Sequence, residues 1–288
     1  MNTVSLLRSA RMIFGFGESR RYSASRQQRD TASRPRDGRV DLVGAGPGDP
    51  ELMTLKGWRL LQQADVIVYD ALVSQALLDQ LPAHIPLRYV GKRKGHHAMS
   101  QNAICELLVT LAQQGQRVVR LKGGDPLVFG RLTEEMAALR QQRIPFSLVP
   151  GITAAAGCAA SVGFPLTERQ TAPRLRLITA HSCDDRPIDW ADLARRDETL
   201  VFYMGLSMAT TISQELKRHG LPADWPALLV ENGTTPQQRC VHTSLGRLAE
   251  AARENHLSGP TLIYLGRVVE NAQRPTTAMA VVSAARGE

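Results

Sequence analysis

The sequence predicts an α/β protein built from two α/β domains, and three observations support this. Short β-branched apolar runs alternate with segments of helical periodicity along most of the 288 residues. Three glycine-rich segments, 44–50, 121–126 and 149–154, each follow such a run and precede a helical pattern. A chain of this length is also long for a single hydrophobic core. Because open α/β sheets bind ligands at the carboxyl ends of their strands, the glycine-rich segments indicate an enzyme.

The first half of the chain is expected to form a mostly parallel sheet with crossover helices. The clearest helix is 100–114, because its large aliphatic residues recur at i, i+3, i+4 and i+7 and Gly115 supplies a stop. The expected strands are 40–45, 65–69, 87–91, 117–121 and 146–149.

A second alternating set of strands and helices follows. Its helices are expected near 207–219 and 244–255, and its strands at 175–179, 199–204, 227–230, 239–243 and 261–265. The sequence therefore predicts an N-terminal domain over 40–152 and a C-terminal domain over 153–270. Residues 271–288 lack a periodic signal and are expected to form a loose tail.

The net charge of +8 comes mainly from residues 1–39. That segment holds nine arginines, no lysine and three acids, whereas the rest of the chain is nearly neutral. A nearly neutral folded part argues against a broad phosphate-binding face, so no nucleic-acid partner is expected. The Arg- and Ser-rich start is typical of either a disordered bacterial extension or an organellar transit peptide. We expect a disordered extension on a cytoplasmic protein. The alternative is a transit peptide on a protein imported into an organelle.

The longest uncharged stretch and the cysteines argue against a membrane-spanning protein and against a metal or redox protein. Residues 144–167 have the length of a membrane span, but three prolines and three glycines interrupt them. A buried loop and a small-residue helix are expected there, and no membrane partner. No short paired spacing of the kind that metal or redox motifs need is found among Cys105, Cys158, Cys183 and Cys240, so reduced thiols and no metal site are expected.

The first glycine-rich segment resembles a dinucleotide-binding loop only in part. Its third glycine comes four residues after the first rather than five, and Pro47 has no N–H to donate. A pyrophosphate cradle needs such donors, although Asp65 and Asp70 lie near the spacing of a ribose-binding acid. We therefore expect a ligand without a pyrophosphate and disfavour a nicotinamide-dependent dehydrogenase.

Seven separated segments together carry a more specific pattern. They are 43–50 (VGAGPGDP), 68–70 (VYD), 90–93 (VGKR) with 96–97 (HH), 120–126 (RLKGGDP) with 129–131 (FGR), 149–154 (VPGITA), 203–205 (YMG) and 231–238 (ENGTTPQQ). Over about residues 40–270 the chain thereby resembles the uroporphyrinogen-III C-methyltransferases of the tetrapyrrole methylase family, which use S-adenosylmethionine. A chance match to one glycine loop is common, whereas a match to seven segments in order is not.

The resemblance implies that S-adenosylmethionine (S-adenosyl-L-methionine) binds in the cleft between the two domains. Glycines let the backbone approach a ligand closely, an aspartate can accept from its ammonium or hydroxyl groups, and a methionine forms a polarizable apolar wall. A homodimer is expected as well. The cofactor-binding residues implied are Pro47, Gly123, Gly124, Asp125, Val128, Thr153, Ala154, Met204 and Gly233.

By the same resemblance Asp70 is the proton acceptor and Lys92 the proton donor. Attack by a porphyrinogen ring carbon leaves a cation that must lose a proton. Asp70 also ends an apolar strand, where a buried charge is costly unless it has a partner or a task. The substrate is rich in carboxylates, which arginine grips bidentately, so Arg131 and Arg169 are expected to clamp it, with Glu134 beside Arg131. Arg131 is counted as catalytic too.

Other features lie on the substrate side. His96 and His97 are expected to be loop residues near the substrate mouth rather than metal ligands. Ala71, the pair Leu132 and Thr133, and residues 168–171 depart from the usual family pattern, whereas the cofactor motifs are intact. Leu132 and Thr133 stand where the family commonly has two glycines, so they are expected to add volume near the substrate wall.

The resemblance therefore implies methylation of uroporphyrinogen III, a small-molecule tetrapyrrole, to precorrin-1 and precorrin-2. These compounds lead toward siroheme, cobalamin-type corrins or haem d1. The alternatives are a methylase of the same fold that acts on another tetrapyrrole precursor or on RNA, and a degenerate paralogue without turnover.

Overall fold

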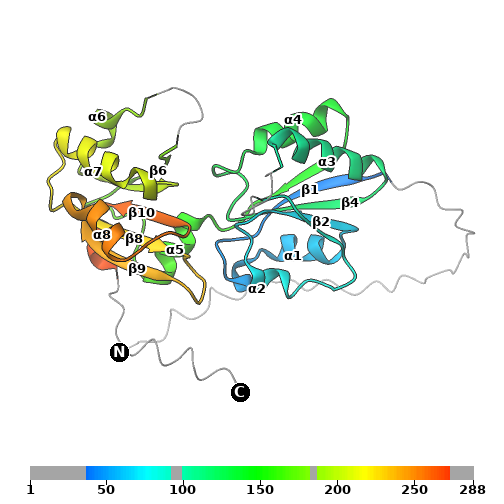
Figure 1. Ribbon diagram of the computed structural model, residues 1–288, viewed down its shortest axis with the longest axis horizontal. Coiled ribbons are helices and arrows are strands. Elements are labelled where there is room, and N and C mark those ends of the chain that lie inside the picture. The colour runs from blue at the N-terminus through cyan, green and yellow to red at the C-terminus, as the bar shows by residue number, and fades with distance from the viewer. Residues whose placement is uncertain (1–36, 92–98, 182–186, 273–288) are drawn as a thin grey trace, which may run out of the picture. The chain divides into compact units, whose positions relative to one another are not determined.

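The computed structural model describes residues 37–91, 99–181 and 187–272, which form two α/β halves, each with its own five-stranded sheet (Figure 1). This confirms the predicted fold class. Several predicted features lie outside the described residues. They are Lys92, His96, His97, Cys183, nearly all of the basic segment 1–39, and residues 273–288 of the expected C-terminal tail.

The first sheet is entirely parallel, with the strand order β3-β2-β4-β1-β5. Its strands are β1 (Arg39–Gly44), β2 (Val66–Tyr69), β3 (Leu87–Tyr89), β4 (Arg117–Lys122) and β5 (Phe146–Val149). All five predicted strands are thus confirmed to within two residues at either end. Because every pair is parallel, all five carboxyl ends lie at the same edge of the sheet.

Helices cover both faces of this sheet (Figure 1). They are α1 (Leu55–Gln62), α2 (Gln75–Leu78), α3 (Gln101–Gln113) and α4 (Leu132–Gln141). Successive strand residues point to opposite faces, so Val43 packs with α1 and α2 while Leu42 packs with α3 and α4. The predicted helix 100–114 is α3, and the Ser100 hydroxyl caps it by accepting a hydrogen bond from the Ala103 N–H at 3.2 Å.

The second sheet is mixed, with the order β6-β7-β10-β8-β9. Its strands are β6 (Arg174–Thr179), β7 (Glu198–Tyr203), β8 (Pro226–Glu231), β9 (Arg239–Ser244) and β10 (Thr261–Leu265). The predicted strands are again found, but only β6 and β7 run parallel. The short connection between β8 and β9 closes an antiparallel hairpin, because a parallel crossover needs a longer link.

The helices of the second half also lie on two faces of its sheet. Helix α5 (Ala154–Val162) covers one face and packs with Tyr264, whose hydroxyl donates to the Ala155 carbonyl at 2.9 Å. Helices α6 (Trp190–Leu193), α7 (Ala209–Arg218) and α8 (Leu248–Glu254) contribute to the core on the other face. The division of the chain between residues 152 and 153 stays a prediction.

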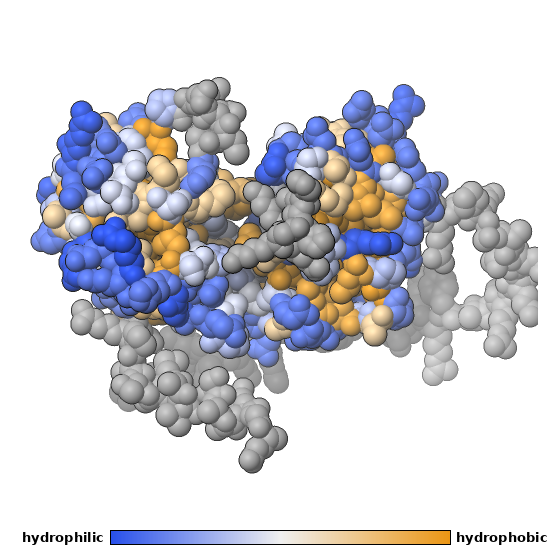
Figure 2. Space-filling view, in the orientation of Figure 1, coloured by the Kyte–Doolittle hydropathy of each residue, from blue (hydrophilic) through white to orange (hydrophobic). Residues whose placement is uncertain are grey.

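The long uncharged stretch 144–167 divides into β5, a glycine-containing loop and α5. Among the residues that the structure describes, no helix combines the length and the apolar character needed to cross a bilayer. Figure 2 shows hydrophobic residues over the middle of each half and hydrophilic residues around the outer rims.

A close backbone contact between glycines holds the carboxyl edge of the first sheet. A Cβ added at Gly151 would lie 2.3 Å from the Gly124 carbonyl oxygen and 2.9 Å from the Gly44 Cα. We expect Gly151→Ala to lower the free energy of unfolding by about 2–3 kcal/mol, because backbone cannot move aside as a flexible side chain can. Urea unfolding followed by circular dichroism measures it.

The matched control is Gly205→Ala, where the added Cβ would contact side-chain carbons of Ile263 and Phe202 at 3.1 and 3.2 Å. Those atoms can yield slightly, so we expect this variant to lose less than about 1 kcal/mol. Equal losses in the two variants would contradict the role of the Gly151 contact.

Candidate active site

Four strands of the first sheet direct the predicted motifs to one edge. The three glycine-rich segments follow β1, β4 and β5, which are adjacent in the order β4-β1-β5. Asp70 comes directly after β2, which is the neighbour of β4 on its other side. The prediction that these segments lie at carboxyl ends of strands is therefore confirmed, and parallel pairing brings them together.

The glycine-rich loops bind one another through their backbones. The Gly46 N–H donates to the Gly124 carbonyl at 3.1 Å, and the Gly124 N–H donates back to the Gly46 carbonyl at 2.7 Å. Donors used in this way cannot cradle a pyrophosphate. Pro47 packs on α5, since a Cβ at Gly157 would lie 2.4 Å from the Pro47 Cγ. Both observations agree with the prediction of a ligand without a pyrophosphate.

A cavity of about 1060 Å³ opens at this edge and is lined by residues from both halves. Asp70, Arg131 and all nine predicted cofactor residues line it, whereas Glu134 and Arg169 do not. The roles of these residues stay predictions. The nine are Pro47, Gly123, Gly124, Asp125, Val128, Thr153, Ala154, Met204 and Gly233.

The floor of the cavity beside the second glycine-rich loop is open and carries an unused acceptor. A Cβ at Gly124 would meet only the Ala154 nitrogen, at 3.7 Å. The Asp125 Oδ1 accepts the Leu127 N–H at 2.9 Å, which fixes the side chain. Its Oδ2 has no hydrogen-bond partner in the described part of the chain. This oxygen is therefore available to an ammonium or hydroxyl group of a ligand.

Several residues that line the cavity have a left-handed backbone. Values of φ near +50° are uncommon outside glycine and concentrate at functional sites. Phe129 and Met204 are 41% and 53% exposed, although both residues are large and apolar. Such exposure beside a cavity suits contact with an apolar part of a ligand. The left-handed residues are Phe129, Arg131, Met204 and Asn232.

Tyr203 connects the predicted cofactor residue Thr153 and the start of α5 to the second sheet. Its hydroxyl lies 2.6 Å from the Thr153 Oγ1 and accepts the Ala155 N–H at 3.0 Å, at the start of α5. The Tyr203 ring also contacts the Phe129 ring, with centroids 5.0 Å apart. Burial raises the pKa of the Tyr203 hydroxyl, so it stays protonated. No role was predicted for Tyr203 from the motif 203–205 in which it stands.

Asp70 is held by two donors. Its Oδ1 accepts the Leu72 N–H at 3.1 Å, and its Oδ2 accepts from the Arg120 Nη2, also at 3.1 Å. The carboxylate is 25% exposed and lines the cavity. A carboxylate in this setting is fixed in direction yet open to a ligand on one side, as a proton acceptor must be.

Behind Asp70 lies a buried charged cluster that sequence reasoning missed. Glu135 of α4 is fully buried, and its Oε1 accepts from the Arg120 Nε at 3.1 Å, from the Lys122 Nζ at 2.9 Å and from the Gln101 Nε2 at 3.4 Å. Burial, and next the charge of Arg120, lower the pKa of the Lys122 ammonium. The available signal was two cations, Arg120 and Lys122, at alternate positions in the second half of β4, which places both on one face of the sheet.

The predicted substrate side is only partly assembled around the cavity. Arg131 lines it and donates to Glu134 at 2.9 Å, so Glu134 holds Arg131 without lining the cavity itself. Arg169 lies in the loop before β6 and does not reach the lining. Leu132 begins α4 and packs on the core with α3, so it does not narrow the cavity wall as the sequence had led us to expect.

Within the described ranges, no group of three or more His, Cys, Asp or Glu side chains is placed so that it could hold a metal ion. Cys105 and Cys158 are buried free thiols, and Cys240 is half-buried.

Comparison with known proteins gives a consistent picture. The profile of the tetrapyrrole (corrin/porphyrin) methylases matches residues 39–249. A siroheme synthase 2 of Yersinia enterocolitica is 53% identical over 232 residues, covering 81% of this chain and 49% of that protein. A siroheme synthase of Escherichia fergusonii is 51% identical over 232 residues, covering 81% and 50%. The chain thus spans about half the length of the curated relatives it matches.

Solved structures match over nearly their full length. A uroporphyrin-III C-methyltransferase from Thermus thermophilus, in complex with S-adenosylhomocysteine, is 42% identical with a TM-score of 0.70, covering 81% of this chain and 99% of that one. A cobalt precorrin-4 methyltransferase of cobalamin biosynthesis is 28% identical with a TM-score of 0.74, covering 83% and 99%. The family match over residues 39–249 and these relatives confirm the predicted family: the chain belongs to the tetrapyrrole methylases.

Proposed function

We propose that this protein transfers a methyl group from S-adenosylmethionine to a ring carbon of a tetrapyrrole, with uroporphyrinogen III as the acceptor and precorrin-2, formed through precorrin-1, as the product. The observation that carries the proposal is the single cavity that combines the glycine-rich loops with the fixed carboxylate of Asp70. Its volume of about 1060 Å³ is at the upper end of ordinary ligand sites. It therefore suits a cofactor and an acceptor together.

The residues present fit S-adenosylmethionine better than a dinucleotide. The open space over Gly124 admits a ligand against the backbone, and the free oxygen of Asp125 can accept from its ammonium or ribose hydroxyls. Met204 adds an apolar wall, and no phosphate charge has to be met. When bound, the cofactor supplies the methyl group of its sulfonium, and the rest of the cofactor leaves as a neutral thioether.

The protein's own task in this reaction is alignment followed by proton removal. A carbon–carbon bond forms as the sulfur–carbon bond breaks, and holding the two reactants in line lowers the barrier. The acceptor then carries a positive charge and loses a proton, which Asp70 takes up. Lys92 remains the proposed proton donor; it lies outside the described residues.

Recognition of the substrate carboxylates is proposed for two arginines, of which Arg131 lines the cavity and Arg169 does not. Arg131 is 59% exposed and keeps donors free beside its contact with Glu134. A planar guanidinium can grip a substrate carboxylate with two parallel hydrogen bonds. Arg169 is proposed as a second such group, contributed from the loop before β6.

The biological setting is proposed from the relatives. Proteins named siroheme synthase share half of their length with this chain, so we infer a role in siroheme formation, with corrin or haem d1 formation as alternatives. We further propose a homodimer in the cytoplasm that acts on a small molecule and binds neither nucleic acid nor membrane. The near-neutral charge of residues 40–288 supports the exclusion of nucleic acid.

The cofactor assignment is tested by titration calorimetry with S-adenosylhomocysteine and with NAD and NADP. We expect S-adenosylhomocysteine to bind and NAD and NADP not to bind, because the N–H groups of Gly46 and Gly124 already donate to backbone carbonyls. Asp125→Ala should weaken the binding of S-adenosylhomocysteine about 10- to 100-fold, as loss of a charge-assisted hydrogen bond predicts. Glu250→Ala, which removes an exposed partner of Arg247, is the control and should bind normally. Tight NAD binding would overturn the assignment.

The acceptor assignment is tested by product mass after incubation with uroporphyrinogen III and S-adenosylmethionine. We expect masses increased by one and then two methyl groups. Asp70→Asn should lower turnover by about 100-fold or more, because the amide keeps the shape but cannot take up the proton. The affinity of this variant for S-adenosylhomocysteine should be unchanged. Wild-type turnover in Asp70→Asn would mean that another group accepts the proton.

A further inference from the structure

An unbroken line of contacts runs from a buried glutamate to the cavity. Glu135 accepts from the Arg120 Nε, and the Arg120 Nη2 donates to Asp70. The Arg120 side chain is only 4% exposed and that of Glu135 is fully buried. The cavity-facing carboxylate is thus connected through one arginine to an acid deep in the α3 and α4 side of the sheet.

The remaining donors of Arg120 are committed to the backbone. Its Nη1 donates to the Leu121 carbonyl at 2.9 Å and lies 3.4 Å from the Val68 carbonyl. A guanidinium offers five N–H groups in a rigid fork, and at least four are engaged here. Arg120 therefore has little left to give a substrate, and its orientation is determined by the protein.

Stability alone does not account for this arrangement. Removing two charges from water costs about as much as their attraction returns, so a buried ion pair is weak evidence of stabilisation. Lys122 already neutralises Glu135 at 2.9 Å, and a second buried cation adds to the cost. The Oε2 of Glu135 also has no hydrogen-bond partner in the described part of the chain. The feature that Arg120 adds is its contact with Asp70.

We propose that Arg120, anchored by Glu135, is a positioning residue that fixes the direction of the Asp70 carboxylate for proton acceptance. This rests on the proposed function, in which Asp70 accepts the proton. The Leu72 N–H holds one oxygen of the carboxylate and Arg120 holds the other. Without Arg120 the carboxylate can rotate about its side-chain torsions, because one backbone hydrogen bond does not determine its plane.

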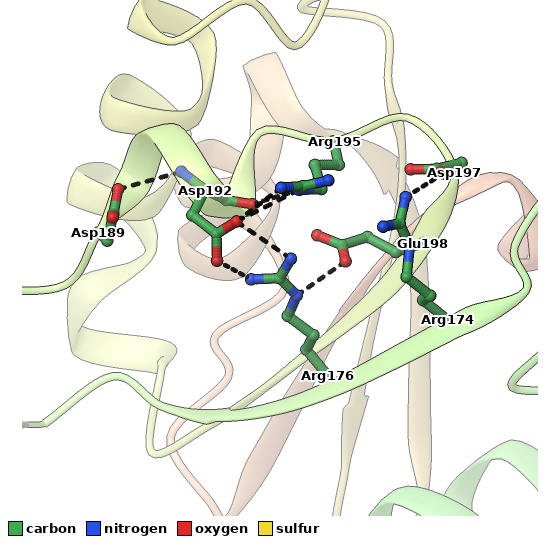
Figure 3. A network of polar contacts seen from close by, with 7 residues as sticks. All are labelled: Arg174, Arg176, Asp189, Asp192, Arg195, Asp197 and Glu198. Atoms are coloured by element: carbon green, nitrogen blue, oxygen red, sulfur yellow. Dashed lines mark hydrogen bonds and ion pairs between the residues drawn. The ribbon is translucent and has the colours of Figure 1, made fainter.

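A second network in the same protein provides a matched control (Figure 3). Arg176 of β6 donates to the buried Glu198 of β7 at 2.8 Å and also contacts Asp192 of α6. It therefore bridges a buried glutamate and a more exposed aspartate, as Arg120 does. None of the seven residues drawn in Figure 3 lines the cavity.

The central experiment is Arg120→Met in the full chain. The substitution leaves Lys122 and Glu135 as a balanced pair, so the fold loses less than it would from removing Glu135. We expect kcat for methylation of uroporphyrinogen III to fall about 10- to 100-fold, the usual effect of losing a group that orients a reactive side chain. KM for uroporphyrinogen III and the Kd for S-adenosylhomocysteine should stay within about twofold. Arg176→Met should keep wild-type kcat.

The variant Arg120→Lys keeps the positive charge but loses the hydrogen-bonding geometry of the guanidinium, so it tests which of the two Asp70 requires. A point charge cannot hold Asp70, Glu135 and two carbonyls together, so this variant should also lose most of its kcat. Recovery of wild-type kcat in Arg120→Lys would overturn the positioning role.

A double-mutant cycle with Asp70→Asn shows whether Arg120 acts through Asp70. In single-turnover reactions analysed by mass spectrometry, Arg120→Met should change the rate of the Asp70→Asn protein by less than about twofold. An equal loss in both backgrounds would make Arg120 a general structural residue and overturn the proposal. If the wild-type protein transfers no methyl group, the proposed function fails and the positioning role with it. An active wild type with an equally active Arg120→Met overturns the positioning role alone.

Discussion

The close packing of backbone against backbone at the carboxyl edge of the first sheet is the constraint on which the site depends. Parallel pairing in the order β4-β1-β5 brings three loops to one place, and glycine at positions 44 and 151 lets them touch. The reciprocal hydrogen bonds between Gly46 and Gly124 then fix the first two loops to each other. Any side chain at the contact would separate the loops, because the facing atoms are backbone and cannot turn away.

This packing also decides which ligand chemistry the edge can offer. N–H groups that satisfy neighbouring carbonyls cannot serve an anion, so the usual phosphate site of a parallel α/β sheet is lost. What remains is open space over Gly124, a free oxygen on Asp125 and the exposed apolar side chains of Phe129 and Met204. That set suits a cationic, partly apolar ligand better than a diphosphate.

The sequence predicted most of the fold, because apolar runs and glycine loops are local signals. Every predicted strand was found, and all nine residues predicted to bind the cofactor line the cavity, since most of their motifs follow directly after strands. Strand direction in the second sheet was not predicted, because hydrophobic alternation is the same in parallel and antiparallel strands. The Arg120–Glu135 contact joins two elements and depends on how α4 packs on β4, which no local pattern encodes. For the same reason Leu132 was expected at the cavity wall but lies on the core.

The two sides of the cavity are built on different physical principles. The proposed cofactor side is mostly backbone and small residues with one aspartate, so its shape is set by close packing. The proposed acceptor side has the charged cavity residues Asp70, Arg120, Lys122 and Arg131, so its properties are set by charges and by the groups that hold them. The contacts of Glu135 with Arg120, Lys122 and Gln101 are made by side chains, whereas Gly46 and Gly124 are joined through their backbones. Such a division lets one fold keep its cofactor while the acceptor varies, which agrees with a match to methylases of different tetrapyrroles.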